Sequence, residues 1–261
     1  MLDKEMTIAN IKEALRTGTV TEEWLDMLRT DKRKGVQMLL ERYDKKKRAE
    51  RQLEKNYETL LTYEKEWRAQ GFHNIAGVDE AGRGPLAGPV TACAVILPHD
   101  SFFPGLNDSK QLTKGKREYF AALIKERALA YEIVHVPAQT VDKINIYQAA
   151  KEAMIKAVTG LSLEADALFI DALTLPLPAK QLRLIQGDAK SASIAAASVL
   201  AKTARDSYML ELAERYPEYG FDRHMGYGTK EHLAALQEFG PTPEHRRSFS
   251  PVQSAVSRLN G

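Results

Sequence analysis

The first 70 residues carry apolar side chains at intervals of three and four, the spacing of one face of an α-helix. Thr7 or Asn10 is placed to begin a first helix and Thr21 a second, because these side chains accept hydrogen bonds from the free N–H groups of a first turn. A long charged helix is predicted over 33–68. The apolar positions that would form a small core are Ile8, Ile11, Leu15, Trp24, Leu25 and Leu28. We therefore predict a separate, basic helical module over residues 1–70.

From residue 74 onward, short apolar runs alternate with amphipathic stretches. That alternation is typical of an α/β domain, in which helices pack on the faces of a sheet. Strands are predicted near 75–80, 88–97, 131–136, 167–171 and 181–186, and helices over 113–128, 140–159, 189–215 and 229–239. The first caps of these four helices would be Thr113, Thr140, Asp188 and Thr229. Residues 71–261 are therefore expected to form one α/β domain that ends in helices.

Composition excludes several classes of protein. The 261 residues are 44% hydrophobic and 28% charged, which suits a globular chain with a sizeable core. The single cysteine, Cys93, lies in an apolar run, so we expect a buried thiol and no disulfide within the chain. The start of the chain lacks the order of basic and apolar residues typical of a leader, and no run approaches the roughly 18 apolar residues of a membrane span. We predict a cytoplasmic protein with no membrane contact, and a monomer.

Positive charge is concentrated near the front of the chain, although the net charge is only +2. Residues 29–55 hold eleven Lys and Arg against five Asp and Glu. A basic helix of this kind binds nucleic-acid phosphates in some proteins and is a solvated, ion-paired helix in others. The sequence leaves both interpretations open.

Two adjacent acids follow an apolar run and precede a glycine loop in Ala76–Pro85, AGVDEAGRGP. Asp79 and Glu80 would cost several kcal/mol at the end of a buried strand, on the order of the penalty for an unpaired buried charge. A hard divalent cation would neutralise them. The alternative to a metal site is that the strand reaches the protein surface at these acids and that the glycines only form a turn. A dinucleotide-binding loop is disfavoured, because the glycine spacing is wrong and the acids would repel a pyrophosphate.

Two further acids stand at the ends of apolar runs. Asp171 ends ALFID, and Asp188 follows a glycine step after LRLI. If the strands concerned lie side by side, four carboxylates meet at one place and make a site for one or two Mg²⁺ or Mn²⁺ ions. Taken alone, Asp188 is equally well explained as the N-cap of a helix that begins near Ala189.

The motifs that follow resemble one known family. They are DEAGRGPLAGPV at 79–90, LNDSKQL at 106–112, LFIDAL around Asp171, GDAKSASIAAASVLAKTARD at 187–206 and GYGT at 226–229. In this order they resemble type 2 ribonuclease H, the bacterial ribonuclease HII, over about residues 72–250. The resemblance implies a ribonuclease H-like fold, a mixed five-stranded sheet flanked by helices. It also implies a metal-dependent endonuclease that cuts the RNA strand of RNA/DNA hybrids and incises duplex DNA at embedded ribonucleotides.

The resemblance also implies residue roles, carried over motif by motif. The metal-binding and catalytic carboxylates would be Asp79, Glu80, Asp171 and Asp188. The loop that meets the 2′-hydroxyl groups would be Gly82, Arg83 and Gly84. Tyr227 would press on the ribose at the RNA-to-DNA junction, and Lys110 would lie near a phosphate. The sequence departs from the family pattern at Ala172, where glycine is common, and at Met225, where a basic residue is common.

The chemistry of phosphodiester hydrolysis suits these residue types independently of the family. Carboxylates hold hard cations, which activate water and stabilise the leaving oxygen, so the products should be a 3′-hydroxyl and a 5′-phosphate. Glycines let backbone groups approach a 2′-hydroxyl, the group that separates RNA from DNA. Two alternatives remain: a non-catalytic hybrid-binding protein, which would need no acid cluster, and another two-metal phosphohydrolase, which would need no loop for the 2′-hydroxyl.

Overall fold

The computed structural model describes residues 6–259. Contacts divide the chain into two units, residues 1–56 and 57–261. The sequence-based boundary near residue 70 stays a prediction. In the described part of the chain, no helix is long and apolar enough to cross a membrane.

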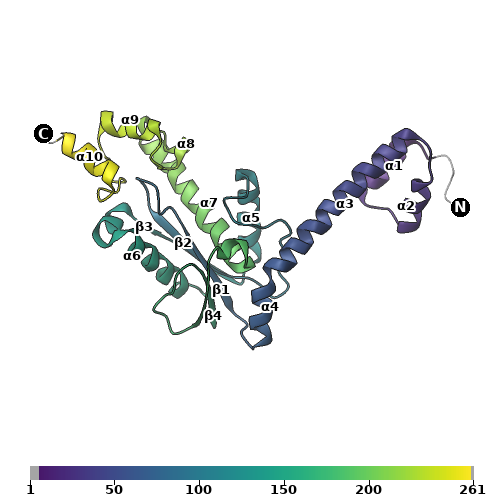
Figure 1. Ribbon diagram of the computed structural model, residues 1–261, viewed down its shortest axis with the longest axis horizontal. Coiled ribbons are helices and arrows are strands. Elements are labelled where there is room, and N and C mark those ends of the chain that lie inside the picture. The colour runs from purple at the N-terminus through teal and green to yellow at the C-terminus, as the bar shows by residue number, and fades with distance from the viewer. Residues whose placement is uncertain (1–5, 260–261) are drawn as a thin grey trace. The chain divides into compact units, whose positions relative to one another are not determined.

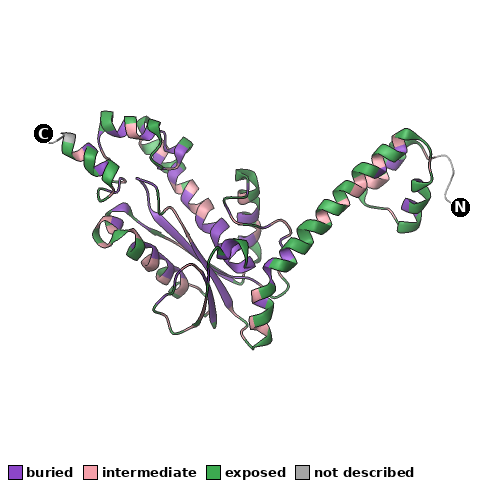
Figure 2. Ribbon diagram, viewed as in Figure 1, coloured by how far each residue is buried: buried purple, intermediate pink, exposed green. Residues whose placement is uncertain are grey.

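The first unit is helical, and its elements are α1 (Ile8–Thr17), α2 (Glu22–Arg29) and the first part of α3 (Lys34–Leu60) (Figure 1). The side chains of Thr7 and Thr21 accept from backbone N–H groups three residues on, so both predicted caps are confirmed. A small apolar core holds the helices together, formed by Ile11, Trp24, Leu25, Leu28, Val36 and Leu40. The rest of α3 in this unit is largely exposed (Figure 2).

The prediction of one helix over 33–68 is wrong, because the structure has a break at Leu61. Helix α3 ends at Leu60, and α4 (Thr62–Ala69) follows. The break lets Tyr57, Leu60 and Leu61 enter one apolar cluster, while Trp67 packs in another.

The second unit is built on a mixed five-stranded sheet in the order β3-β2-β1-β4-β5. Strands β1, β2 and β3 are antiparallel, and β1, β4 and β5 run parallel. The fold class that the resemblance implies, a mixed five-stranded sheet flanked by helices, is confirmed. The strands are β1 (Ile75–Ala81), β2 (Val90–Ile96), β3 (Ala130–Val136), β4 (Ala167–Asp171) and β5 (Lys180–Leu184).

Helices cover both faces of this sheet (Figure 1). Alternate residues of β2 face α6 (Ala138–Thr159) on one side, and the others face α5 (Lys114–Arg127) and α7 (Ala192–Arg215) on the opposite side. Helix α7 passes so close to β1 that a Cβ added to Gly77 would lie 2.0 Å from the Ser193 backbone. The chain then continues through η2 (Pro217–Tyr219), α8 (Phe221–His224), α9 (Lys230–Phe239) and α10 (Ser250–Leu259).

Two predicted caps hold and two do not. Thr113 and Thr229 accept from the first turns of α5 and α9, as expected. Thr140 lies inside α6, which begins after Pro137, a residue whose φ of −71° already suits a helix start. Helix α6 is also kinked at Asn145, which has a φ of 64°; its side-chain oxygen accepts from the N–H groups of the next turn. The fourth predicted cap, Asp188, is described with the site.

Candidate active site

Two predicted site residues lie at the same edge of the sheet. Strands β1 and β4 are parallel neighbours with Val78 opposite Ile170, so Asp79 and Asp171 both follow at the carboxyl ends of adjacent strands. Asp79 is buried. Its pKa is raised well above the usual range by burial and by the nearby charges of Glu80 and Asp171. A buried carboxylate beside two like charges is stabilised by any cation that binds there.

Glu80 is neutralised only in part. Its Oε1 accepts from the Arg83 guanidinium at 3.2 Å, whereas Oε2 is buried with no hydrogen-bond partner. Burial raises the pKa of Glu80, and the charge of Arg83 opposes the rise. A buried carboxylate oxygen without a partner costs about 1–3 kcal/mol. The chemistry of this atom therefore fits a cation ligand.

Asp188 belongs to the short η1 (Gly187–Ala189) and is not the N-cap of α7, which corrects the structural interpretation of this residue. The cap is Ser191, whose hydroxyl accepts from the Ile194 N–H. Because η1 intervenes, Asp188 is free to face Lys110, with 3.6 Å between Oδ2 and Nζ. Burial and the charge of Asp108 raise the pKa of Asp188.

Backbone contacts bring η1 to the end of β4. The N–H of Gly187 donates to Oδ1 of Asp171 at 2.8 Å. Asp171 is followed by Ala172 at a φ of 53°, in the left-handed region that favours glycine. At position 172 the backbone therefore favours glycine, the residue that is common in the family, although this sequence has alanine there.

Asp79, Glu80, Asp171 and Asp188, which we call the acidic edge, thus lie on three neighbouring segments. Across residues 6–259, no three His, Cys, Asp or Glu side chains converge closely enough to enclose a metal ion in the conformation described. Their metal-binding role stays a prediction.

Glu64 was not predicted, and it supports this region from α4. Its Oε1 accepts from the Ser191 hydroxyl at 2.6 Å and from the Ser193 N–H at 2.9 Å. It therefore closes the N-terminus of α7, directly after the turn that carries Asp188. A glutamate in a charged helix carries no sequence signal for this contact, because its partners are more than 120 positions away.

The loop between β1 and β2, residues 82–89, wraps around a buried arginine that the sequence analysis missed. All five N–H groups of Arg246 donate, at 2.6–3.1 Å, to the carbonyl oxygens of Gly82, Arg83, Pro85 and Gly88. Burial lowers the pKa of Arg246 to about 9. No pattern in HRRSFSP distinguishes this arginine from the exposed Arg247 beside it.

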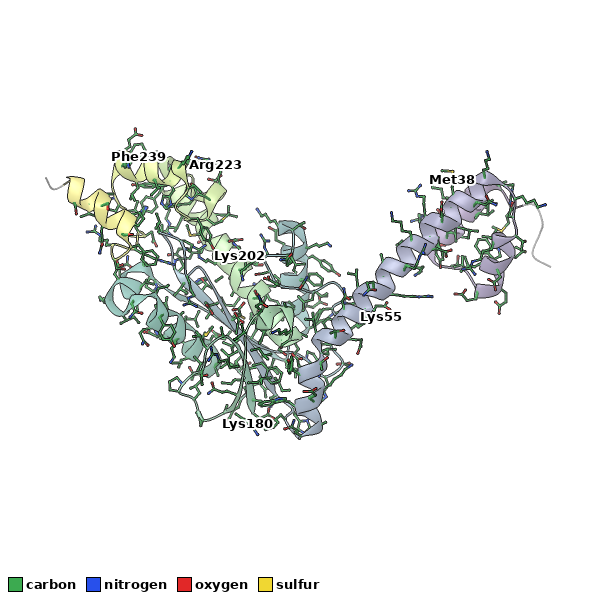
Figure 3. The ribbon with its side chains drawn as sticks, in the orientation of Figure 1. Met38, Lys55, Lys180, Lys202, Arg223 and Phe239 are labelled. Atoms are coloured by element: carbon green, nitrogen blue, oxygen red, sulfur yellow. The ribbon has the colours of Figure 1, made fainter. Side chains whose placement is uncertain are left out.

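A second buried arginine, Arg205 of α7, holds the other end of the same loop. It donates to the carbonyl oxygens of Pro89, Ala87 and Met225 at 3.0–3.2 Å. Its neighbour Asp206 pairs instead with Lys202 at 2.6 Å. Lys202 is labelled on α7 in Figure 3. Arg205 therefore acts through the backbone of the loop.

Tyr227 is half-exposed on a turn that buried histidines hold from behind. The Thr242 N–H donates to Nδ1 of His245, so Nε2 of His245 carries a proton and donates to Nε2 of His232 at 3.0 Å. The Nδ1–H of His232 then donates to the Tyr227 carbonyl at 2.9 Å. His224 accepts from the Gly226 N–H and completes the support. Burial lowers the pKa of His232 to about 4 and that of His245 to about 3.

Most of the predicted binding residues share one cleft of about 270 Å³. Ser109 Oγ lies 2.9 Å from Ser198 Oγ of α7, which fixes the loop that carries Lys110. The predicted site residues that line the cleft are Glu80, Gly82, Arg83, Gly84, Lys110 and Tyr227. Asp79, Asp171 and Asp188 do not line it, although they lie on the adjoining segments.

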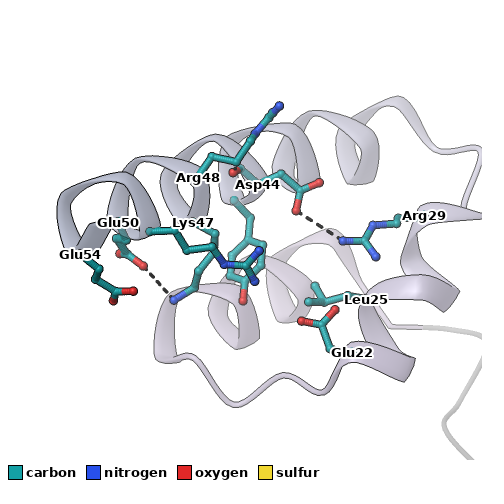
Figure 4. A pocket seen from close by; sticks show the side chains of 10 residues that line it. Glu22, Leu25, Arg29, Asp44, Lys47, Arg48, Glu50 and Glu54 are labelled. Atoms are coloured by element: carbon teal, nitrogen blue, oxygen red, sulfur yellow. Dashed lines mark hydrogen bonds and ion pairs between the residues drawn. The ribbon is translucent and has the colours of Figure 1, made fainter. Parts of the chain in front are cut away.

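A larger hollow lies within the first unit, between α2 and α3 (Figure 4). Four basic and four acidic residues line it, so the hollow itself carries no surplus of positive charge. Arg29 lies 3.6 Å from Asp44, and Lys47 lies 2.9 Å from Glu50. The basic stretch at 29–55 is therefore in part an ion-paired helix surface.

Known proteins match both parts of the chain. The family model described as Ribonuclease HII matches residues 76–252, and the model described as Ribonuclease HII N-terminal domain matches residues 7–68. The Ribonuclease HII of Halalkalibacterium halodurans is 54% identical over 258 residues, which are 98% of each chain. That of Geobacillus thermodenitrificans is 53% identical over 255 residues, 97% of this chain and 98% of the relative.

Solved structures share the fold at lower identity. The ribonuclease H2 of Pyrococcus horikoshii aligns with a TM-score of 0.63 and 24% identity, over 72% of this chain and 99% of that one. Bst-RNase HIII, solved in complex with Mn²⁺, aligns with a TM-score of 0.55 and 16% identity, over 71% and 70%. The family match and the relatives more than 50% identical over nearly the whole length show that the chain belongs to the ribonuclease HII family of ribonuclease H hydrolases.

Proposed function

We propose that the protein hydrolyses the RNA strand of RNA/DNA hybrids and incises duplex DNA on the 5′ side of embedded ribonucleotides, using a divalent metal. The products would be a 3′-hydroxyl and a 5′-phosphate. The observation that carries the proposal is that the acidic edge adjoins the 82–89 loop, because only Ala81 separates Glu80 from Gly82 in the chain. Carboxylates suited to hydrolysis therefore lie next to a loop suited to reading a ribose.

Asp79, Glu80, Asp171 and Asp188 would hold the metal, either Mg²⁺ or Mn²⁺ and one ion or two. The unpartnered Oε2 of Glu80 and the raised pKa of Asp79 support this assignment. A bound divalent ion supplies Lewis-acid stabilisation of the phosphate oxygens and lowers the pKa of an attacking water. The chain's own part is to hold these carboxylates where together they can bind and orient that ion.

Recognition of the substrate would come from the cleft. Backbone groups of Gly82, Arg83 and Gly84 would meet the 2′-hydroxyl, which distinguishes RNA from DNA. Tyr227, half-exposed on its turn, would pack against the ribose at the junction. Lys110, paired with Asp188 at 3.6 Å, would meet a phosphate close to the scissile bond.

The basic helical module would add non-specific contacts to the phosphate backbone of the duplex. Testing this needs a truncation that leaves the second unit intact. Tyr57, Leu60 and Leu61 pack in the core of the catalytic unit, and Glu64 closes α7. A chain that starts at Tyr57 therefore tests the module, whereas one that starts at Gly71 also damages the active site. Equal hybrid affinity and equal salt dependence for the full chain and the chain from Tyr57 would contradict the proposal.

The decisive experiment is cleavage of two substrates, a DNA duplex with one ribonucleotide and a continuous RNA/DNA hybrid, with Mg²⁺ or Mn²⁺. Metal-dependent incision 5′ of the single ribonucleotide, lost in Asp79→Asn, would support the whole proposal. Cleavage of the long hybrid alone would contradict the proposal that Arg83 and Tyr227 recognise the RNA-to-DNA junction. Binding without cleavage would indicate a hybrid-binding protein, and hydrolysis of small phosphate esters would indicate another phosphohydrolase.

A further inference from the structure

The 82–89 loop is held mainly through its carbonyl groups, although the N–H groups of Leu86 and Gly88 also donate, to the carbonyl oxygens of Gly226 and Glu244. The side chains of Arg246 and Arg205 together donate hydrogen bonds to the carbonyl oxygens of six of its eight residues. The backbone N–H of Arg246 donates to the carbonyl oxygen of a seventh, Leu86. A guanidinium group has five N–H donors in a rigid planar fork, and Arg246 uses all of them here. Few side chains could replace that pattern.

Carbonyl groups that point inward fix the direction of the neighbouring N–H groups. In a trans peptide the C=O and the following N–H point in opposite directions. The carbonyls of Gly82 and Arg83 face Arg246, so the N–H groups of Arg83 and Gly84 face away from it. Both residues are exposed, and neither N–H donates a hydrogen bond within the part of the chain that the structure describes.

Sterics keep the loop in this form at Gly82 but not at Gly84. Gly82 has a φ of 89°, and a Cβ there would lie 2.0 Å from Nε of Arg205. Gly84 has no such restraint, because a Cβ there would lie 3.5 Å from Cε1 of Tyr227, an ordinary contact. The loop is therefore tightly packed against Arg205 at Gly82, whereas at Gly84 it has room for a Cβ beside Tyr227.

We propose that Arg246, together with Arg205, is a positioning residue for ribose recognition: by drawing the loop carbonyls inward, it aims the N–H groups of Arg83 and Gly84 at the 2′-hydroxyl oxygen of the ribonucleotide. This inference rests on the proposed function. Two successive N–H groups that point the same way form an acceptor-binding site that costs no rearrangement when the ligand arrives. Arg246 does not touch the substrate and acts only through the loop.

The two arginines add a second effect through their charge. Both guanidinium groups are buried, and every hydrogen bond they make goes to a carbonyl rather than to a carboxylate. Their positive charge is therefore not cancelled by a paired acid, and it lies under the loop that would face a phosphate backbone. Arg246→Lys keeps a basic side chain but loses the planar fork, so it tests the fork.

The test is binding specificity measured in the full-length chain with Asp79→Asn, which prevents cleavage. Affinity is compared for a DNA duplex with one ribonucleotide and for the same duplex in all-DNA form. Arg246→Lys should reduce the ratio of the two affinities about tenfold, the value of one net hydrogen bond, and should leave all-DNA affinity and its salt dependence unchanged. Arg247→Lys is the matched control, because that arginine is adjacent and exposed.

An unchanged ratio in a folded Arg246→Lys variant would overturn the inference, as would an equal fall for both duplexes. If that variant does not fold, the amide resonances of Arg83 and Gly84 in the Asp79→Asn chain decide instead. They should shift with the ribonucleotide duplex and not with the all-DNA duplex, and the absence of that difference would overturn the inference. Failure of the proposed function is separate, since it would appear as no incision by the wild-type chain.

Discussion

The 82–89 loop and the acidic edge are neighbours in the fold, but their polar groups are satisfied in opposite ways. In the loop, seven of eight carbonyl groups accept a hydrogen bond from Arg246 or Arg205. At the acidic edge, Oε2 of Glu80 has no partner, and burial raises the pKa of Asp79. The protein therefore satisfies the polar groups of the loop by itself and leaves a buried carboxylate oxygen of the acidic edge without a partner.

The two regions also differ in the sign of their unpaired charge. Under the loop, two buried guanidinium groups have carbonyl partners only. At the acidic edge, four carboxylates face only Arg83 and Lys110 among the cations that pair with them in the described residues. Each region is thus unbalanced in charge, and the two imbalances suit a substrate that brings phosphates and a cation together.

The largest effect is expected from Asp79→Asn. Activity should fall more than about 100-fold, because even the outer partners of a metal ligand are worth 10–100-fold. Without metal, the free energy of unfolding should rise by about 1 kcal/mol, since the amide removes a buried charge beside two like charges. Cleavage rates and urea unfolding measure the two effects, with the exposed Asp222→Asn as the control. An Asp79→Asn variant that is less stable than the wild type and fully active would contradict this account of the acidic edge.

Acid should destabilise the histidine-supported turn. His232 and His245 stay neutral in the folded chain down to pH values of about 4 and 3, whereas unfolded histidine protonates near 6.5. Between these values the unfolded state binds more protons, so the free energy of unfolding falls as the pH falls. The loss should be about 3 kcal/mol for one ring. The buried acids act with the opposite sign, because protonation relieves the charge of Asp79 and its neighbours.

Urea unfolding at pH 7.5 and pH 4.5 tests this prediction. His232→Gln should show a smaller loss of stability in acid than the wild type, whereas His73→Gln, on the surface, should match the wild type. A His73→Gln chain that lost the pH dependence to the same extent would argue against a role for the buried rings.

Metal should stabilise the acidic edge and leave the loop unchanged. At a concentration 100 times its Kd, Mn²⁺ should raise the free energy of unfolding by about 2.7 kcal/mol if it binds the folded chain alone. Thermal unfolding with and without Mn²⁺ measures the rise, which Asp79→Asn should reduce and Gly84→Ala should preserve. The same rise in all three chains would place the metal elsewhere.

The smallest effects should separate Gly82 from Gly84. Gly82→Ala should cost about 1–2 kcal/mol of stability, because the left-handed φ and the contact with Arg205 both oppose a Cβ. Gly84→Ala should change stability by less than about 0.5 kcal/mol and reduce affinity for the ribonucleotide duplex. Thermal unfolding and duplex binding measure the pair. Equal loss of stability in both variants would show that the loop needs Gly84 for its own fold.

Local signals in the sequence predicted much of the fold. Thr7, Thr21, Thr113 and Thr229 cap the helices that follow them, because a cap depends on groups within three residues. The strands that carry Asp79 and Asp171 were placed within about two residues, since apolar runs with acidic ends are also local. The break at Leu61 and the kink at Asn145 were missed because packing and an internal cap decided them.

The sequence by itself thus predicted which residues would carry the chemistry and in what order, and it indicated the family to which the chain belongs. Only the tertiary structure decided that Ser191 caps α7 and leaves Asp188 to face Lys110. It also decided that Arg246, more than 150 positions from Gly82, shapes the 82–89 loop. Motifs record contacts between residues close in the chain, whereas a buried arginine is defined by the carbonyl groups that the fold brings around it.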